Sequence, residues 1–253
     1  MLTDPTDWPD GVGRQVLDEV DSTNAEAARI APTLAGPEWI LALKQTRGRG
    51  RRGRAWADPT GNFAATYVMQ PSEPPAQVAL RSFVASLALY DALVAACGRS
   101  DCFALKWPND VLLNGGKLAG ILLESIGSGP KTSHLAIGIG VNLKTAPGLG
   151  EVEKDATPPV ALLSETGALV TPPEFLSLLA PAYAKWEHQF TTFGFEPVRT
   201  AWLARAARIG QVITARTGRS EIIGTFEAID TSGQLILSTP KGRQAIAAAD
   251  IYF

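Results

Sequence analysis

The 253-residue sequence predicts an α+β protein: a mixed or antiparallel sheet with helices packed on it, followed by a small β domain. Apolar, strand-like runs alternate with alanine- and leucine-rich helical stretches through most of the chain. Asn114 and Gly115 separate two such runs as a tight hairpin turn, because both residue types tolerate a positive φ. From about Arg208 the chain changes to short β-rich runs. We therefore expect a large domain over residues 1–206 and a small domain over residues 207–253.

The large domain begins with a short helix in "DSTNAEAARI", where Ser22, Thr23 or Asn24 is suited to the N-cap position. Two apolar strands and a long helix follow. This helix is proline-free, with apolar residues at helical spacing. The four elements are expected over residues 21–30, 38–44, 62–71 and 78–97.

Four further strands are expected over residues 102–107, 110–113, 117–126 and 133–143, so that the helices cover one face of a sheet. A loop-like stretch, 144–159, precedes two helices over 172–190 and 196–207, and Pro181 is expected to start or kink the first. The small domain contains β-rich runs over 210–217, 221–230, 233–239 and 243–253. A unit of roughly 45 residues is marginal alone, so it should lean on the large domain as an antiparallel barrel or sandwich.

The composition excludes several classes of protein. A formal net charge of -2 argues against a chain-wide electrostatic surface for DNA or RNA. The N-terminus has no secretory signal pattern, and no run approaches the roughly 18 consecutive apolar residues of a membrane span. We therefore expect a cytoplasmic protein with no membrane partner, in which Cys97 and Cys102 are free thiols. Two cysteines and two histidines are too few for a spaced zinc site.

Residues 47–54 form a run of five arginines and three glycines between two predicted strands. Gly48, Gly50 and Gly53 spell the G-x-G-x-x-G pattern of a dinucleotide-binding turn, but that turn needs a helix after its last glycine. Turn-forming residues follow Gly53 instead, and no Walker sequence is present. The context therefore argues against a dinucleotide site.

The same Arg/Gly loop is well suited to bind an anion. Guanidinium groups supply forked donors for carboxylate and phosphate, and glycines let backbone N–H groups approach the ligand. Five like charges repel one another, so we expect the empty loop to be mobile and to become ordered when an anionic ligand neutralises it. The alternative is a solvated RNA-binding segment, although such segments normally lie in longer repetitive tails.

A second polar stretch covers residues 105–124. Asn109 and Asp110 follow a proline at the start of a strand, where their oxygens could hold a hydrated Mg²⁺ that bridges phosphates. Lys117 begins the next strand, and Gly120 leaves space for a ligand beside the backbone. Alternatively, "PND" forms an Asx turn and Lys117 is an exposed strand-end charge. The presence of the Arg/Gly loop in the same chain favours the ligand site.

Four motifs, in order, closely resemble those of the biotin protein ligases, the biotin–acetyl-CoA-carboxylase ligases: "DSTN" (21–24), "GRGRRGRAW" (48–56), "KWPNDVLLNGGKLAGILLE" (106–124) and "GIGVNL" (138–143). The resemblance runs from about residue 14 to the C-terminus and is strongest through Leu143. It implies a catalytic domain like that of class II aminoacyl-tRNA synthetases and a small SH3-like β-barrel. Some members carry an N-terminal DNA-binding domain. Only about 20 residues precede "DSTN", so we expect no DNA partner.

The resemblance implies a two-step, ATP-dependent reaction. The biotin carboxylate attacks the α-phosphate of ATP, pyrophosphate leaves, and biotinyl-5'-AMP forms. A lysine of the biotin carboxyl carrier protein of acetyl-CoA carboxylase then displaces AMP. Such chemistry asks for cations around the phosphates, here with Mg²⁺, and little covalent participation by the enzyme.

The resemblance also implies site residues at the matching positions. Lys117, Arg49 and Arg51 are expected to be catalytic, with Lys117 neutralising the charge that builds between carboxylate and α-phosphate. The expected biotin site is Ser22, Thr23, Asn24, Gln45, Arg49, Gly50, Arg51, Lys117 and Gly120. The expected ATP site is Arg51, Arg52, Arg54, Trp56, Asn109, Asp110, Lys117 and Asn142, with Mg²⁺ at Asn109 and Asp110. From the residues alone, Ser22 could be a plain N-cap, Trp56 a core residue and Asn142 a strand-end cap.

Two other functions stay open at this point. A lipoate protein ligase shares the fold and the adenylation logic, and a non-catalytic RNA-binding module would use the Arg/Gly loop. The intact pair "GRGRRGR" and "KWPND...GGKLAG" favours biotin. An exposed sheet edge could serve a second subunit, giving a homodimer, or the carrier protein. The chain ends at "AADIYF" without the basic tail that some relatives place near ATP, which leaves the small domain's part in nucleotide binding open.

Overall fold

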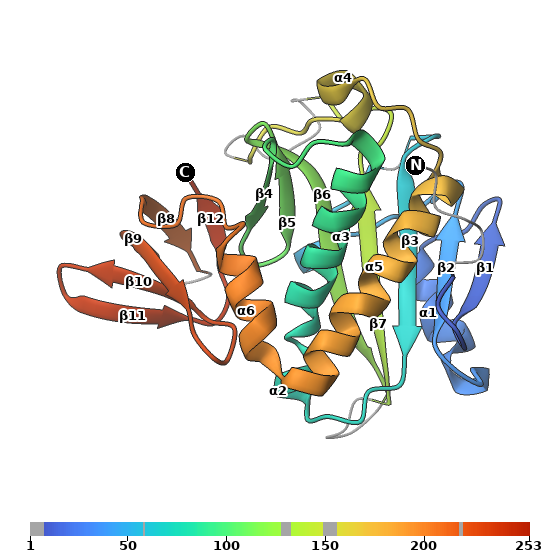
Figure 1. The fold of residues 1–253 in the computed structure, drawn as a ribbon, viewed down its shortest axis with the longest axis horizontal. Coiled ribbons are helices and arrows are strands. Elements are labelled where there is room, and N and C mark those ends of the chain that lie inside the picture. The colour runs from blue at the N-terminus through green and yellow to red at the C-terminus, as the bar shows by residue number, and fades with distance from the viewer. Residues whose placement is uncertain (1–7, 58, 128–132, 149–155, 218–219) are drawn as a thin grey trace.

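The computed structural model describes residues 8–57, 59–127, 133–148, 156–217 and 220–253. It contains a seven-stranded sheet with helices on both faces and a five-stranded sheet formed by the C-terminal residues (Figure 1). The strands of the larger sheet are ordered β1-β2-β3-β7-β6-β5-β4. Their bounds are β1 Gly13–Leu17, β2 Glu38–Ala42, β3 Phe63–Met69, β4 Phe103–Lys106, β5 Asp110–Leu113, β6 Gly116–Ile126 and β7 His134–Val141.

The larger sheet is mixed, as predicted. β1 and β2 pair in parallel, and the other neighbouring strands pair antiparallel. Asn114 and Gly115, with φ of 51° and 82°, join β5 to β6 and confirm the hairpin turn. The sequence analysis missed β1, because this edge strand is largely exposed and offers no apolar run.

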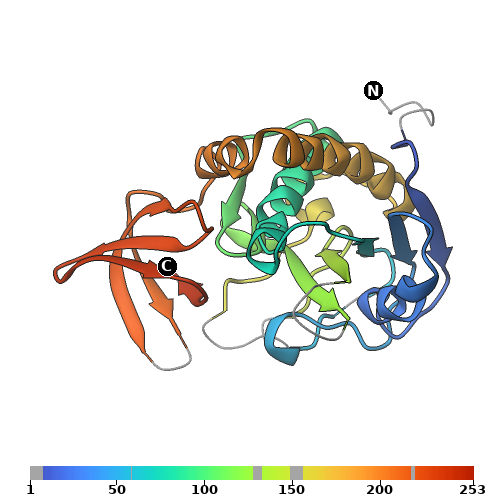
Figure 2. The same ribbon diagram turned by 90° about the horizontal axis from the view of Figure 1, so that it is seen from below.

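Two long helices, α3 (Arg81–Cys97) and α5 (Pro172–Phe193), cover one face of this sheet (Figure 2). Tyr183 of α5 packs its ring against Trp39 and Tyr67 of the sheet. Pro75–Cys97 is apolar and long enough to cross a membrane, but it is largely buried in this core. Its hydropathy is therefore explained by packing inside the protein.

The helices differ in detail from the prediction. A separate turn of helix, α2 (Pro75–Val78), precedes α3, and the predicted start at residue 78 is the last residue of α2. Pro181 lies inside α5 and does not start it. α6 (Phe195–Leu203) follows α5 directly, as predicted, whereas the short α4 (Leu162–Thr166) was missed. Both cysteines are free, in agreement with the sequence analysis.

α1 (Thr23–Ile30) lies on the opposite face of the sheet, which corrects the prediction that helices cover a single face. Its Ala27 packs with Ile40 of β2, Val68 of β3 and Ala136 of β7 in a small second core. The contacts of α1 are with β2, β3 and β7. The same face therefore remains available for a ligand site beyond the N-terminus of α1.

The C-terminal sheet is antiparallel throughout and has the order β11-β10-β9-β8-β12. Its strands are β8 Val212–Arg216, β9 Glu221–Ile229, β10 Leu235–Thr239, β11 Gly242–Ile246 and β12 Asp250–Tyr252. The backbone N–H of Leu105 in β4 donates to the carbonyl of Arg205, and Trp107 Nε1 donates to the carbonyl of Gly233 at 3.1 Å. One continuous apolar core joins the two sheets, so the small unit leans on the large one as expected.

Candidate active site

The site is a pocket of about 610 Å³ on the face of the large sheet that α1 partly covers. It lies between the N-terminus of α1, the Arg/Gly loop, the strands β6 and β7, and Asp250 of β12. One end is formed by neutral polar side chains, and the other end by cations. The predicted residues on its wall are Ser22, Thr23, Asn24, Gln45, Arg49, Gly50, Arg51, Arg54, Trp56, Asn109, Asp110, Lys117, Gly120 and Asn142.

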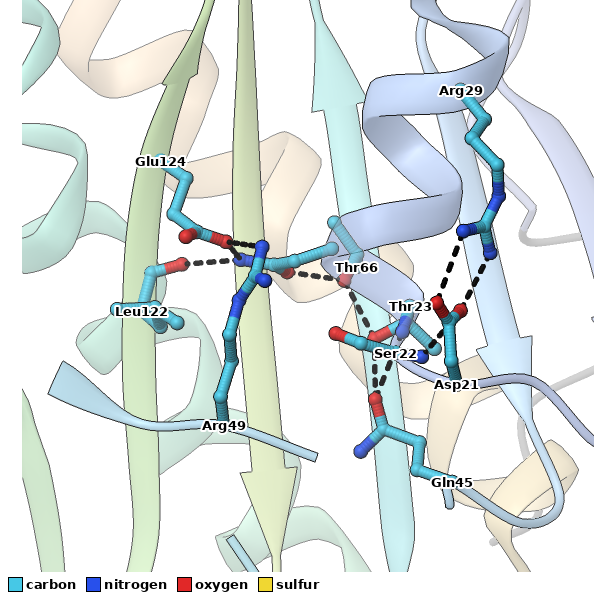
Figure 3. Close-up of polar contacts among 10 residues, drawn as sticks. Asp21, Ser22, Thr23, Arg29, Gln45, Arg49, Thr66, Leu122 and Glu124 are labelled. Atoms are coloured by element: carbon cyan, nitrogen blue, oxygen red, sulfur yellow. Dashed lines mark hydrogen bonds and ion pairs between the residues drawn. The ribbon is translucent and has the colours of Figure 1, made fainter. Parts of the chain in front are cut away.

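A hydrogen-bond network orders the neutral end (Figure 3). The backbone N–H of Thr23 donates to Gln45 Oε1 at 2.9 Å, and the Thr23 hydroxyl lies 3.2 Å from the same oxygen. Thr66 of β3 lies 2.8 Å from the Thr23 hydroxyl and donates to Asn24 Oδ1 at 2.6 Å. A hydroxyl has one proton, so Thr66 donates to one of these two oxygens at a time, while the Thr23 hydroxyl donates to Gln45 Oε1. The network thereby fixes the orientation of both amides.

The network continues into the cationic end. Asn24 Nδ2 donates to Glu124 Oε2 at 2.7 Å and lies 3.4 Å from the Leu122 carbonyl. The same oxygen of Glu124 accepts from Arg49 Nη2 at 3.0 Å (Figure 3). Glycine is required at position 138, because a Cβ there would lie 2.3 Å from Asn24 Oδ1. A chain of contacts therefore connects Gln45, at the neutral end, to the guanidinium of Arg49.

Ser22 occupies the N-cap position of α1 but makes no side-chain cap hydrogen bond. The neighbouring Asp21 accepts from the Ser22 N–H at 2.8 Å and pairs with Arg29 at 2.6 Å. These contacts, with the Arg29 hydrogen bond as the largest, lower the pKa of Asp21 to about 2. Because Asp21 binds the Ser22 N–H and the cap bond is not made, the Ser22 hydroxyl on the pocket wall can bind a ligand.

The Arg/Gly loop folds back on itself, with a bridge between Arg49 and Ala55 and a 3-10 turn over Arg51–Gly53. No helix begins within the described residues 54–57 and 59–62, which argues against a dinucleotide-binding turn here. The Gly50 N–H donates to the Arg54 carbonyl at 2.7 Å. The N–H of Gly50 is therefore used within the loop, and the expected approach of an anion to the other loop glycines stays a prediction.

Asp250 of the C-terminal sheet pairs with three arginines of the loop. Its carboxylate lies 2.5 Å from Arg52, 3.0 Å from Arg54 and 3.9 Å from Arg51. Burial lowers the pKa of Arg51, although Asp250 and Asp110 oppose that shift. Among the predicted site residues, Arg52 does not line the pocket and is instead held by Asp250. The small domain therefore supplies one side chain, Asp250, to the wall of the pocket.

Lys117 and Asp110 meet at the cationic end. Lys117 Nζ lies 2.8 Å from Asp110 Oδ1, and hydrogen bonds to Pro158 and Val160 hold the backbone of Lys117. Asn109 donates through Nδ2 to the Ile121 carbonyl at 2.7 Å, which leaves its Oδ1 to accept from Arg51 at 3.3 Å. One carboxylate and one amide oxygen thus lie beside an ammonium and a guanidinium.

Trp56 lines the pocket over the glycines of β6 and β7. A Cβ at Gly140 would lie 2.5 Å from the Trp56 ring, and one at Gly120 would lie 3.3 Å from it. Gly120 lies beside Trp56 and also lines the pocket, so its contact with a ligand stays a prediction. Trp56 Nε1 is buried and has no hydrogen-bond partner within the described ranges. Lys117 Nζ lies 5.9 Å from the centre of the ring.

Asn142 lies at the end of β7 on the pocket wall and is buried. Its Nδ2 donates to the Val160 carbonyl at 3.1 Å, and its backbone carbonyl accepts from the Leu162 N–H at 2.8 Å. The side chain therefore ties the segment after the strand to the sheet, close to the strand-end role considered from the sequence. Its Oδ1 could still accept a bond from a ligand.

Four residues near the site were missed by the sequence analysis. Thr66 is a lone polar residue in an otherwise apolar strand, and that contrast could have identified it. Glu124 and Lys106 were inside the recognised motif without an assigned role. No local signal marks Asp250, since its arginine partners lie about 200 positions earlier in the chain.

Comparison with known families gives two matches. The family described as Biotin/lipoate A/B protein ligase matches residues 16–142, and the Biotin protein ligase C terminal domain matches residues 209–253. The chain is 60% identical over 238 residues to Biotin--[acetyl-CoA-carboxylase] ligase of Paracoccus denitrificans, covering 94% of this chain and 99% of that protein. It is 31% identical over 240 residues to the bifunctional ligase/repressor BirA of Bacillus subtilis, covering 92% of this chain and 72% of that protein.

Solved structures agree on the fold. Biotin protein ligase from Aquifex aeolicus in complex with biotin and ATP matches with a TM-score of 0.80 and 24% identity, covering 94% of this chain and 97% of that one. The apo structure of the same protein matches with a TM-score of 0.77 at 21% identity. At this identity the likeness concerns the architecture, and it supports the α+β class predicted from the sequence.

Proposed function

The chain belongs to the biotin/lipoate A/B protein ligase family, and from this premise we infer that it is an ATP-dependent biotin protein ligase. It activates biotin to biotinyl-5'-AMP and transfers the biotinyl group to a lysine of the biotin carboxyl carrier protein of acetyl-CoA carboxylase. The 60% identity to the Paracoccus ligase extends over nearly the whole of both chains, so the same activity is the simplest assignment.

One observation of the structure carries this function: a single pocket joins an uncharged hydrogen-bonding end to a cationic end. The neutral end, with Ser22, Thr23 and Gln45, offers both donors and acceptors, as a cyclic urea requires. The cationic end offers guanidinium and ammonium groups, as a carboxylate and a phosphate require. A ligand with a neutral polar ring and an anionic tail, such as biotin, spans the two ends.

In the first step a biotin carboxylate oxygen forms a bond to the α-phosphorus of ATP, and the bond to the β,γ-diphosphate breaks. Both reactants are negatively charged, so the barrier contains a large electrostatic component. Arg49, Arg51 and Lys117 all line the pocket. Their positive charges offset the repulsion and stabilise the charge that develops on the phosphoryl oxygens.

The expected Mg²⁺ fits the residues of this end. No group of three or more His, Cys, Asp or Glu side chains within the described ranges forms a protein cage for a metal. Mg²⁺ is commonly held by one or two carboxylates together with substrate phosphates, and Asp110 with the amide oxygen of Asn109 is such a set. When bound, the ion would neutralise phosphate charge beside Lys117 and Arg51.

In the second step a carrier lysine amine attacks the acyl carbon of the mixed anhydride and AMP leaves. The enzyme's task is to hold the adenylate and to exclude water, because water would hydrolyse it. Trp56 supports this by packing an apolar ring over Gly140 and Gly120, on the adenylate side of the pocket. We place the reaction in the cytoplasm, where the carrier's substrate lysine and ATP are both available.

A biotinylation assay tests the proposal. Purified protein with biotin, ATP and Mg²⁺ should form biotinyl-5'-AMP and should label a biotin carboxyl carrier domain at one lysine. Formation of lipoyl-AMP without biotinyl-AMP would reassign the chain to the lipoate branch of the family. RNA binding at physiological salt without ATP–pyrophosphate exchange would instead favour a non-catalytic role for the Arg/Gly loop.

A further inference from the structure

The second substrate of the proposed reaction must enter a site that repels it. A lysine side chain arrives as an ammonium ion, because its ordinary pKa is about 10.4. The end of the pocket where it reacts is lined by Arg49, Arg51, Arg54 and Lys117. Like charges raise the free energy of an approaching cation, so the lysine needs an anionic partner at its point of entry.

Three carboxylates of the described residues pair with the cations of this end, and two of them are committed. Asp110 pairs with Lys117 at 2.8 Å and is the expected Mg²⁺ ligand. Asp250 holds three arginines of the loop. The side chains of Asp110 and Asp250 are 16% and 17% exposed, whereas that of Glu124 is 33% exposed. Within the described ranges, its ion pair is with Arg49 alone. Glu124 is therefore the carboxylate best placed to meet a cation from solvent.

Glu124 lies at the end of a row of residues that faces the pocket. Alternate residues of a strand project from one face, and Gly120, Leu122 and Glu124 alternate along β6, which pairs with β7 in unbroken register. Gly120 and Leu122 line the pocket. The Glu124 carboxylate, next in the row, accepts from Asn24 Nδ2 at 2.7 Å and from Arg49 Nη2 at 3.0 Å (Figure 3). Glu124 is thus at the rim, bonded to two residues of the pocket wall.

The ion pair between Glu124 and Arg49 is one that a substrate can open. It consists of a single hydrogen bond, and the Arg49 side chain is 43% exposed. Ion pairs of this kind contribute little to stability, so the biotin carboxylate can take the Arg49 guanidinium. Glu124 would then keep its hydrogen bond from Asn24 but lose its cation. Binding of the first substrate thereby prepares an anionic partner for the second, beside the carboxyl group that reacts.

We propose that Glu124 binds the ammonium group of the carrier lysine after biotin has taken Arg49 from it. This assignment rests on the proposed ligase function and adds a residue to its second step. Arg49 contacts Glu124 and is the expected partner of the biotin carboxyl group. A cation that replaces Arg49 at Glu124 is therefore held close to the acyl carbon of the adenylate.

The transfer step then proceeds without a further reactant. The bound ammonium loses one proton to solvent, which the neighbouring cations favour because they lower the pKa of the lysine. The amine nitrogen forms a bond to the acyl carbon, and the bond from that carbon to the phosphate oxygen breaks. AMP leaves with the electron pair, and the nitrogen loses its second proton to solvent as the amide forms.

Transfer from synthetic biotinyl-5'-AMP to the carrier domain tests this assignment, because it isolates the second step. Glu124→Gln keeps the size of the side chain and an acceptor for Asn24 but removes the charge. The KM for the carrier domain should rise about 5- to 20-fold, with kcat within about twofold of wild type. Glu124→Lys should raise this KM about tenfold further, because it repels the ammonium. The matched control is Glu227→Gln in the C-terminal sheet, which should leave the KM unchanged. Glu227 also pairs with an arginine, Arg243, and is 35% exposed.

Two further measurements separate binding of the lysine from a structural effect. Hydroxylamine is uncharged at neutral pH, so its reaction with enzyme-bound biotinyl-5'-AMP should stay within about twofold of wild type in Glu124→Gln. The biotin Kd of this variant should not rise, because Arg49 loses a competing partner. An unchanged carrier KM, an equal loss with hydroxylamine, or weaker biotin binding would each overturn the assignment. If wild-type protein transfers no biotin from biotinyl-5'-AMP to the carrier domain, the proposed function itself fails, independently of Glu124.

Discussion

Replacing Gly138 with alanine should disable the biotin end of the pocket through a single displaced amide. Gly138 pairs with Thr66 on β3 and with Leu122 on β6, so the Asn24 amide lies directly over it. An added Cβ would lie 2.3 Å from Asn24 Oδ1, whereas a carbon normally keeps about 3.3 Å from an oxygen. The amide must therefore retreat by about 1 Å.

That displacement has a calculable cost. It breaks the bond from Thr66 to Asn24 at 2.6 Å and the bond from Asn24 to Glu124 at 2.7 Å. A neutral hydrogen bond contributes about 1 kcal/mol and one to a charged acceptor about 1.5–3 kcal/mol, with the lower value apt for the partly exposed Glu124. Alanine has a lower conformational entropy than glycine in the unfolded chain, and this difference offsets about 0.5–1 kcal/mol of the lost unfolding free energy. We expect Gly138→Ala to lose about 2 kcal/mol of unfolding free energy.

Chemical denaturation measures the stability, and biotin titration measures the consequence for binding. The biotin Kd should rise about tenfold, because Thr23 and Gln45 lose their fixed partner through Thr66. Gly36→Ala is the matched control, since its Cβ would meet only an ordinary contact of 3.6 Å to the Gly11 carbonyl. In an Asn24→Ala background, Gly138→Ala should cost little. The same cost in both backgrounds would refute the reasoning, because the methyl would then act elsewhere.

Three further substitutions probe other parts of the molecule. Lys117→Ala should slow biotinyl-5'-AMP formation by about 10²- to 10³-fold in single-turnover assays while the melting curve changes little, and wild-type adenylation would remove this residue from catalysis. Gly140→Ala should displace the Trp56 ring, because the added Cβ would lie 2.5 Å from it. The KM for ATP should rise about tenfold while the biotin affinity stays unchanged. An unchanged KM would show that the ring is not part of the nucleotide site. Glu73 pairs with the buried Arg81 at 2.8 Å, and this hydrogen bond lowers the pKa of Glu73. The ion pair therefore contributes its full stability above the ordinary pKa of a glutamate, and that stability is lost as the pH falls through the lowered pKa of Glu73. Glu73→Gln should therefore be less stable than wild type at pH 7 by about 1 kcal/mol, and in acid titrations the difference should vanish once the pH has fallen below the lowered pKa of Glu73; a constant difference would contradict this.

Much of the larger sheet could be predicted, because its inner strands carry continuous apolar runs that local patterns reveal. β1 could not, since it is exposed and depends on a parallel partner that the local sequence does not specify. The placement of α1 also escaped prediction: "NAEAARI" predicts a helix but does not say which face of the sheet it covers. Its Ala27 contacts Val68 and Ala136, which lie far away in the chain.

The candidate site, too, could be predicted only in part from the sequence. The linear motifs identified the Arg/Gly loop and Lys117, because arginine forks and a strand-borne ammonium are chemically conspicuous. The sequence analysis assigned no role to the glycines of "GIGVNL". In the structure they leave space for the side chains of Asn24 and Trp56, and only the folded protein shows which side chain lies over each glycine. Gly120 was assigned to the ligand, and the structure places it on the pocket wall next to Trp56.

The Arg/Gly loop illustrates why charge alone was a poor guide to its conformation. Its five arginines were expected to repel one another, but that expectation counted only the charges within the loop. In the folded protein Glu124 of β6 pairs with Arg49, and Asp250 of β12 pairs with Arg52 and Arg54. An anionic substrate must therefore compete with carboxylates for these guanidinium groups. Its net affinity is the free energy of its own ion pair with an arginine minus that of the protein ion pair it replaces. The arginines of the loop are thus held by carboxylates from both sheets, Glu124 of β6 and Asp250 of β12.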